Sequence, residues 1–298
     1  MYELHHLKGN TYYIDGQTNI GLYVLNKNND VALIDCGPQF EGPIIDSLLR
    51  RYNFHLTHLI LTHSHADHSG CALYLYKITG CMIISSKIER AFMRDAKLDI
   101  GFLYGGYPLN EYDSKLMHVD DNDEIYSLKS IPDGLTYFHL PGHHYGMIGI
   151  KTADGVNFVA DTLGNIDLVD TQKVLLIYDV SGYLNTLDYV ESLNGSIIVP
   201  SHSEVTTNIS EVVNFNRHQI FEIMRLLLDY LKEEHTIEDV CKYIFDYYNL
   251  RISYNKYMII MSTIRSYLSY LSNNKKLKNY FKNNKLVFIL TESFIDKF

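Results

Sequence analysis

The chain has 298 residues, of which 46% are hydrophobic and 20% charged, and its formal net charge is −9 at pH 7. This composition excludes disordered, collagen-like and disulfide-stapled small proteins, and the length allows one large domain or a catalytic domain with a smaller partner. The apolar stretches stop short of the ~18–20 residues of a membrane span, and the first residues lack the order of a signal peptide. We therefore expect a cytoplasmic protein that makes no membrane contact.

Residues 1–206 alternate short β-branched and aromatic runs with turn residues, which predicts strands connected by short loops and helices. The expected strands cover residues 10–14, 20–25, 30–35, 58–62, 82–85, 135–140, 147–151, 156–160 and 196–200. Helical periodicity falls at residues 44–52 and 69–79, the second with Ser69 as its N-cap and Gly80 at its end. Such a mixture indicates two sheets with helices on the outside.

Residues 207–298 have a helical pattern and a mildly basic composition, whereas residues 1–206 are acidic. Helices are expected at residues 212–234, 236–248 and 254–271, and Thr236 begins a capping-box-like sequence. Residues 277–282 and 285–290 are expected to form a hairpin at Asn283-Asn284. This order of elements is typical of a winged helix. We therefore expect a catalytic domain over residues 1–206 and a winged-helix-like domain over residues 207–298.

The strongest chemical signal is the run Thr62-His63-Ser64-His65-Ala66-Asp67-His68, directly after an apolar strand. Three imidazoles and a carboxylate supply the nitrogen and oxygen ligands that zinc or a similar divalent ion prefers. On a loop that leaves a strand, all four cannot reach one ion without strain, but they can serve two neighbouring ions. His63 and His65 would then bind one ion, and Asp67 and His68 the other. The alternative is a solvated polar turn with no metal.

The run strongly resembles the metal-binding motif of the metallo-β-lactamase-fold superfamily, and further signatures of that family follow in order. Each of them stands where a predicted strand ends: Asp35, His143, Asp161 and His202. The resemblance implies an α/β fold, the four-layer αββα sandwich. It also assigns one metal to His63, His65 and His143 and the other to Asp67, His68 and His202, with Asp161 bridging. Asp35 is expected to hydrogen-bond a ligand histidine or its loop instead of binding a metal.

The resemblance implies a metal-dependent hydrolase that attacks a small ester- or thioester-like substrate with a metal-bridging hydroxide, in the style of the glyoxalase-II-like members. Asp67 would accept a hydrogen bond from this nucleophile and direct its attack, which makes it the expected catalytic residue. The nitrogen-rich ligand set favours two zinc ions, with iron or manganese left open. The diiron members that reduce oxygen carry Glu where this chain has His65, so hydrolysis is favoured over redox chemistry.

Other functions stay open. The basic residues of the C-terminal hairpin would hold RNA if the chain were an endoribonuclease, and these residues are Lys275, Lys276, Lys278, Lys282 and Lys285. A Lys-rich hairpin is also a common way to protect a sheet edge, and the C-terminal domain could instead form a homodimer contact or one wall of the substrate pocket. A single-iron dioxygenase and a non-enzymatic metal-binding module are the remaining alternatives.

Candidate substrate-binding residues flank the expected metal site. Residues 88–123 form a long connection in which Tyr104 and Tyr107 flank two glycines, a pattern that suits a flexible aromatic lid. A helical insertion packed on the sheet is the equally favoured alternative. His144 and Tyr145 are candidates for contacting the substrate or protonating its leaving group, because they directly follow His143.

Overall fold

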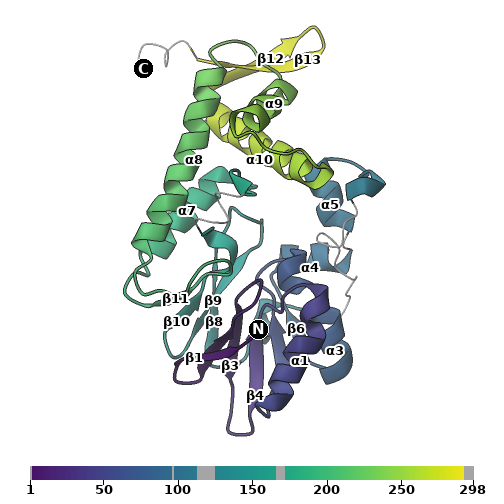
Figure 1. Ribbon diagram of the computed structural model, residues 1–298, viewed down its shortest axis with the longest axis vertical. Helices are drawn as coiled ribbons and strands as arrows, with labels where there is room; N and C mark the ends of the chain where they lie inside the picture. The colour runs from purple at the N-terminus through teal and green to yellow at the C-terminus, as the bar shows by residue number, and fades with distance from the viewer. Residues whose placement is uncertain (1, 96, 113–124, 166–171, 292–298) are drawn as a thin grey trace.

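Two β-sheets with helices on their outer faces form the larger part of the molecule, and further helices extend from one end (Figure 1). The computed structural model describes residues 2–95, 97–112, 125–165 and 172–291. The seven-stranded sheet has the order β1-β2-β3-β4-β5-β6-β7, and its strands are β1 (Leu4–Lys8), β2 (Thr11–Ile14), β3 (Ile20–Val24), β4 (Asp30–Ile34), β5 (His55–Ile60), β6 (Met82–Ile84) and β7 (Ile125–Tyr126). The four-stranded sheet has the order β11-β10-β9-β8, and its strands are β8 (Leu135–His139), β9 (Ile148–Thr152), β10 (Val156–Phe158) and β11 (Ile197–Val199).

Helices cover the outer face of each sheet. On the seven-stranded sheet, α1 (Gly42–Arg51) and α3 (Ala72–Thr79) bury their apolar sides against the strands. On the four-stranded sheet, α7 (Val180–Glu191) and α8 (Ser210–Tyr230) do the same. The short helix α2 (Ala66–Ser69) and the helices α4 (Lys87–Arg94) and α5 (Lys97–Tyr104) lie in connections of the larger sheet.

The two sheets pack face to face through a separate apolar layer. Along β4, Ala32 and Ile34 face the smaller sheet, whereas Leu33 between them faces the helices, because successive side chains of a strand point to opposite faces. Ile150 and Phe158 fill this layer from the smaller sheet. The layer order is therefore helix, sheet, sheet, helix, which confirms the predicted αββα sandwich.

The C-terminal region consists of α8, α9 (Ile237–Tyr247), α10 (Tyr254–Asn273) and a hairpin of β12 (Leu277–Lys282) and β13 (Lys285–Leu290). Thr236 caps α9 with the expected capping box, and Asn283 and Asn284 both have positive φ, as a two-residue hairpin turn requires. Apolar side chains of these helices and of α7 belong to one buried cluster. Among the described helices, none combines the length and the apolar character needed to cross a bilayer.

The structure corrects several expectations about secondary structure. Ser69 does not cap a helix over residues 69–79: it ends α2, where its hydroxyl donates to the carbonyl oxygens of Ser64 and His65, and α3 begins only at Ala72. β5 begins at His55, before the expected strand start, and ends at Ile60. Strands β1 and β7 and helices α4, α5 and α7 were not expected. The helices α5 and α7 have only a weak amphipathic period, whereas α4 has a pronounced one that was overlooked within the long connection over residues 88–123.

We expect replacement of Phe158 with Ala to lower the free energy of unfolding by about 3–5 kcal/mol, because it empties the layer between the sheets. The ring of Phe158 also occupies the space beside Gly21 of β3, where a Cβ atom would lie 2.7 Å from it. Denaturant unfolding measures the effect, with Phe281→Ala as the control because Phe281 is 80% exposed. An equal decrease in the free energy of unfolding in both variants would contradict this packing.

Candidate metal centre

The expected metal-binding residues lie at one end of the two sheets. Asp35 directly follows β4, and the segment that contains His63, His65, Asp67 and His68 follows β5. From the smaller sheet, His143 lies between β8 and β9, Asp161 follows β10, and His202 follows β11. A packed sandwich holds such strand ends in fixed relative positions, so side chains far apart in the sequence converge.

The first group of candidate ligands consists of His63, His65, His143 and Asp161, whose ligand atoms all lie within 4.8 Å of one another. The Nδ1 atom of His65 lies 3.0 Å from the Nε2 atom of His63 and 3.0 Å from the Nε2 atom of His143. A carboxylate oxygen of Asp161 lies 3.5 Å from His143 Nε2 and 3.9 Å from His63 Nε2. Three imidazole nitrogens and one carboxylate oxygen therefore point at a common centre.

The second group consists of Asp67, His68, Asp161 and His202, again with all ligand atoms within 4.8 Å. The Nε2 atom of His68 lies 2.9 Å from Oδ1 of Asp161, and the Nε2 atom of His202 lies 3.2 Å from Asp67 and 3.3 Å from Asp161. Asp161 is thus shared by both groups, which is the geometry expected of a bridging ligand.

The donor atoms suit divalent metal ions. Neutral imidazoles are the form that binds metal, and burial together with the neighbouring imidazoles holds the pKa of His143 at about 3 and that of His63 well below its usual range. In the second group, burial lowers the pKa of His68 and His202, but Asp161 and Asp67 outweigh it and raise the pKa of His202 to about 10 and that of His68 well above its usual range, so a metal ion bound there would displace a proton from each ring. Burial raises the pKa of Asp67, but these charged rings outweigh it and hold this pKa at about 2. Within the described residues, His68 Nε2 and Asp161 Oδ1 are buried 2.9 Å apart and make no hydrogen bond to any other group. Such atoms are satisfied when they bind a cation.

Asp35 lies behind the second group and contacts it by hydrogen bonds. Its Oδ2 atom accepts from Nδ1 of His68 at 2.8 Å and from the hydroxyl of Thr62 at 2.8 Å, and Oδ1 accepts from the backbone N–H of Thr62. The bond to Nδ1 leaves Nε2 of His68 free to face the donor group. Asp35 has a φ of 62°, a strained value for a residue with a side chain, which these bonds hold in place.

Two acidic residues that the motif analysis did not single out lie beside the first group. Glu89 of α4 accepts from the Nδ1 atom of His144 at 2.6 Å, and Asp99 of α5 lies 3.5 Å from Nε2 of the same ring. Burial lowers the pKa of His144, but Asp99 and Glu89 outweigh it and raise this pKa to about 9. His144 is fully buried and both of its ring nitrogens face acidic side chains, so a role toward the substrate stays a prediction for this residue.

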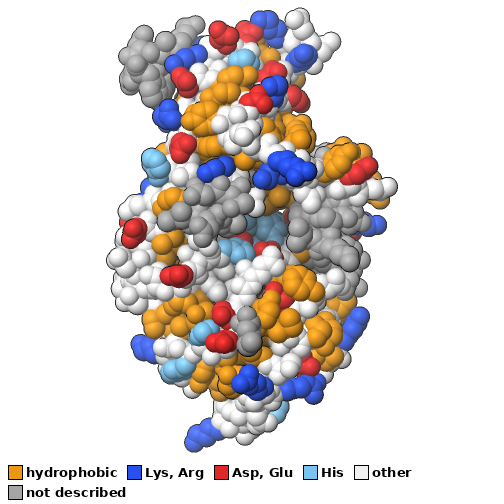
Figure 2. Space-filling view, in the orientation of Figure 1, with side chains coloured by type: hydrophobic (Ala, Val, Ile, Leu, Met, Phe, Trp, Pro, Cys, Tyr) orange, Lys and Arg blue, Asp and Glu red, His pale blue; other side chains and the backbone are white. Residues whose placement is uncertain are grey.

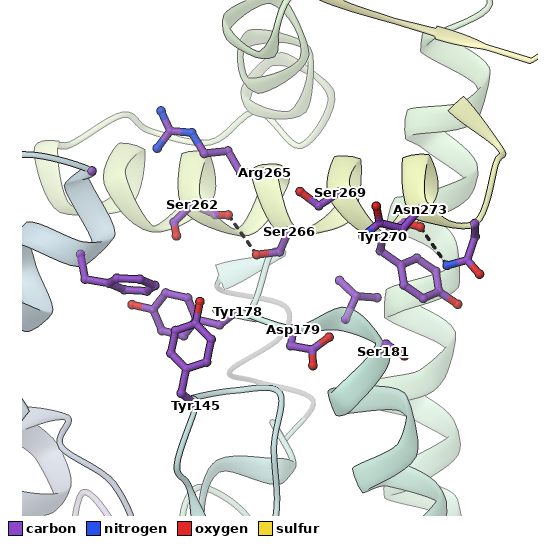
Figure 3. A pocket seen from close by; sticks show the side chains of 14 residues that line it. Tyr145, Tyr178, Asp179, Ser181, Ser262, Arg265, Ser266, Ser269, Tyr270 and Asn273 are labelled. Carbon is purple, nitrogen blue, oxygen red and sulfur yellow. Dashed lines mark hydrogen bonds between the residues drawn. The ribbon is translucent and has the colours of Figure 1, made fainter. Parts of the chain in front are cut away.

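A cavity of 620 Å³ opens between α5, the start of α7 and one face of α10. The stacked rings of Tyr145 and Tyr178 line it on one side, and Ser262, Ser266 and Ser269 of α10 line it on the other (Figure 3). No candidate ligand is among the described residues that line this cavity, but two lining residues lie near His143: Tyr145 is two positions further along the chain, and the backbone N–H of Tyr178 donates to the carbonyl oxygen of Gly142. Figure 2 shows a hollow between the C-terminal helices and the sheets, with histidine and acidic side chains on its floor.

The expected aromatic lid is only partly described. Residues 97–104 form α5, which packs against α10, and Tyr104 and Tyr107 are not among the described residues that line the cavity. Tyr107 is 84% exposed. Residues 113–124 of the expected lid lie outside the described residues. The role of these tyrosines stays a prediction.

Comparisons with known proteins agree with this geometry. Residues 13–202 match the family model of the metallo-beta-lactamase superfamily. The chain is 28% identical over 197 residues to the hydroxyacylglutathione hydrolase GloC of Haemophilus influenzae, and this match covers 64% of the chain and 88% of that protein.

Solved structures with a similar fold cover nearly the whole chain. A beta-lactamase domain protein from Burkholderia ambifaria has a TM-score of 0.75 at 13% identity, covering 97% of this chain and 94% of that one. A metallo-beta-lactamase family protein from Thermus thermophilus has a TM-score of 0.67 at 16% identity, covering 92% and 94%. The shared fold therefore extends over the C-terminal helices.

The two groups predict that metal binding can be removed one ion at a time. We expect His143→Ala to lose the ion of the first group and His202→Ala the ion of the second, because each variant leaves the other group complete. Metal analysis of zinc-saturated protein after gel filtration measures this, with His218→Ala on the exposed side of α8 as the control. Unchanged zinc content in both variants would contradict the assignment.

Proposed function

The chain belongs to the metallo-beta-lactamase superfamily of hydrolases, and we propose that it hydrolyses a small thioester or ester at a centre of two divalent metal ions, preferably zinc. The observation that carries this proposal is the position of Asp161 in both groups of candidate ligands. A carboxylate shared in this way holds two ions close together, which suits attack on a carbonyl carbon by a nucleophile positioned between them.

The residues of each group fit zinc. The first group has three imidazoles and one carboxylate, and the second has two imidazoles and two carboxylates. Sets that include two or three imidazoles favour zinc over magnesium or calcium, which prefer oxygen ligands. When bound, such ions lower the pKa of water and polarise the carbonyl oxygen of a substrate.

Asp67 is the residue that we propose to orient the attacking water. Its side chain is 35% exposed, whereas that of Asp161 is 11% exposed and those of His63 and His68 are fully buried. A carboxylate that reaches the solvent side of the centre can accept a hydrogen bond from a water molecule. This bond would orient the water so that a lone pair of its oxygen points at the carbonyl carbon of the substrate. The low pKa of Asp67 keeps it ionised for this role at neutral pH.

Two observations support a thioester as the substrate. The relative GloC is named a hydroxyacylglutathione hydrolase, and its match covers 64% of this chain. The cavity near the segment of His143 would hold the part of the substrate that does not react, with an aromatic wall for apolar groups and the hydroxyl-bearing face of α10 for polar ones.

We expect the zinc-loaded protein to hydrolyse an S-acyl thioester and to leave a single-stranded RNA intact at matched concentration. Asp67→Asn should lower kcat by about 10²–10⁴-fold, because the amide no longer presents a charged acceptor to the water. Thiol release with a colorimetric reagent measures the first reaction, and gel electrophoresis measures the second.

Cleavage of RNA alone would overturn the thioester proposal in favour of an endoribonuclease. The hairpin lysines Lys275, Lys276 and Lys278 would then be part of the substrate-binding surface, whereas Lys282 pairs with Glu234. Turnover of neither substrate by zinc-, iron- or manganese-loaded protein would contradict the proposed hydrolase.

The cavity predicts a separate effect on substrate binding. Ser266→Phe should raise KM for the thioester by about tenfold or more with a smaller change in kcat, because the ring fills space beside the centre without contacting the donor set. Asn279→Phe on the exposed strand β12 adds the same ring away from the cavity and serves as the control. Equal KM values for the two variants would remove the cavity from the substrate-binding site.

A further inference from the structure

A buried acidic residue connects the two segments that carry the first group of ligands. Glu89 of α4 has no exposed surface. Its Oε2 atom accepts from the backbone N–H of Ser64 at 3.0 Å, and Ser64 lies between His63 and His65. Its Oε1 atom accepts from the backbone N–H of Gly146 at 2.7 Å and from Nδ1 of His144 at 2.6 Å. One carboxylate thus holds both the segment after β5 and the segment before β9.

A second acidic residue faces the outer side of His65. The Nδ1 atom of His65 points at His63 and His143, so its Nε2 atom lies on the opposite side of the ring, where it is buried without a hydrogen-bond partner in the described chain. A ligand atom of His65, one of Asp99 and one of His144 lie within 4.8 Å of one another. The Oδ1 atom of Asp99 is also buried, 3.5 Å from Nε2 of His144.

This arrangement fits a general property of metal-bound histidines. Such a histidine donates its second N–H to a carboxylate, a carbonyl or a water, and that bond fixes the tautomer and the orientation of the ring. A buried carboxylate without compensating bonds costs several kcal/mol, so a fold keeps one only where donors surround it. Glu89 is surrounded by donors, and Asp99 lies in one cluster with His65 and His144.

We propose that Glu89 and Asp99 are positioning residues for the first metal ion: Glu89 holds the segments of His65 and His143 together, and Asp99 orients the ring of His65. The inference rests on the metal centre proposed above. Both residues belong to the connection between β6 and β7, and α5 also contributes Phe102 to the cavity. The same helix therefore holds a metal ligand and lines the substrate-binding space.

Cobalt binding to the metal-free protein tests this inference without turnover. A glutamine has a single acceptor oxygen, so Glu89→Gln can satisfy Gly146 or Ser64 but places an amide N–H against the other donor. We expect Glu89→Gln to weaken one of the two cobalt sites by about 10- to 100-fold and to leave the other unchanged. Asp99→Asn removes the charge and keeps the shape, and we expect it to weaken the same site.

Asp154→Asn is the matched control. Asp154 also accepts hydrogen bonds, from the backbone N–H of Asn10 and the hydroxyl of Thr11, but it precedes β10 whereas Asp161 follows this strand. Cobalt affinity is measured by competition with a chelator, the visible absorption of bound cobalt reports its coordination, and circular dichroism reports the stability of the metal-free chains.

The outcomes separate the inference from the proposed function. Failure of the unmodified chain to bind two cobalt ions would overturn the metal centre itself. If the unmodified chain binds two, and Glu89→Gln and Asp99→Asn bind both as tightly as Asp154→Asn does, the positioning role is overturned. Loss of thermal stability with unchanged cobalt affinity and absorption would mean that these residues are only structural, and would overturn it as well.

Discussion

The buried carboxylate of Asp161 is the constraint on which the site depends. An ionised carboxylate removed from water is costly unless positive charge or hydrogen-bond donors surround it, and here imidazoles from three separate segments do so. The backbone before it is strained, since Ala160 has a φ of 49°. The carbonyl oxygen of Ala160 accepts from the backbone N–H of Ser201, and the buried hydroxyl of Tyr183 donates to the carbonyl oxygen of Thr162 at 2.6 Å. The surrounding structure thus supports the strain on both sides of Asp161.

The centre is assembled across the interface between the sheets, so the packing of the sandwich and the geometry of the site are one problem. His63 and His68 follow a strand of the larger sheet, whereas His143, Asp161 and His202 follow strands of the smaller one. Hydrogen bonds join the two halves of the sandwich next to the ligands. The backbone N–H of Ile148 donates to the carbonyl oxygen of Thr62, and the backbone N–H of Asn19 donates to the carbonyl oxygen of Ser201. A shift of one sheet against the other would therefore break these bonds and separate the ligands. The apolar layer between the sheets opposes such a shift, because close-packed side chains slide only at the cost of cavities or clashes.

Sequence reasoning succeeded where the signal is local. The β-branched strands, the capping box at Thr236 and the turn at Asn283-Asn284 depend on neighbouring residues, and the structure has each of them. The clustered histidines were visible for the same reason. Glu89 gave no such signal, because an acidic residue on a helix rich in charged side chains reads as solvent-exposed, and its burial depends on His144, which is 55 residues away along the chain. The sequence did not predict the burial of His144 either, because its position next to His143 does not determine the direction of its side chain.

The C-terminal helices act on the metal centre through the backbone as well as by lining the cavity. Thr263 of α10 has no exposed surface, and its hydroxyl accepts from the N–H of Ile177 at 3.3 Å. The neighbouring carbonyl oxygen of Leu176 accepts from Nδ1 of His143 at 3.0 Å. This bond places the proton of the ring on Nδ1, so that Nε2 presents its lone pair to the donor group. α10 therefore helps to set the tautomer of a candidate ligand and, with its serine-bearing face, the shape of the space beside it. A change in this helix that moves the segment around Leu176 would alter metal binding and substrate binding together, which ties the C-terminal region to the chemistry of the sheets.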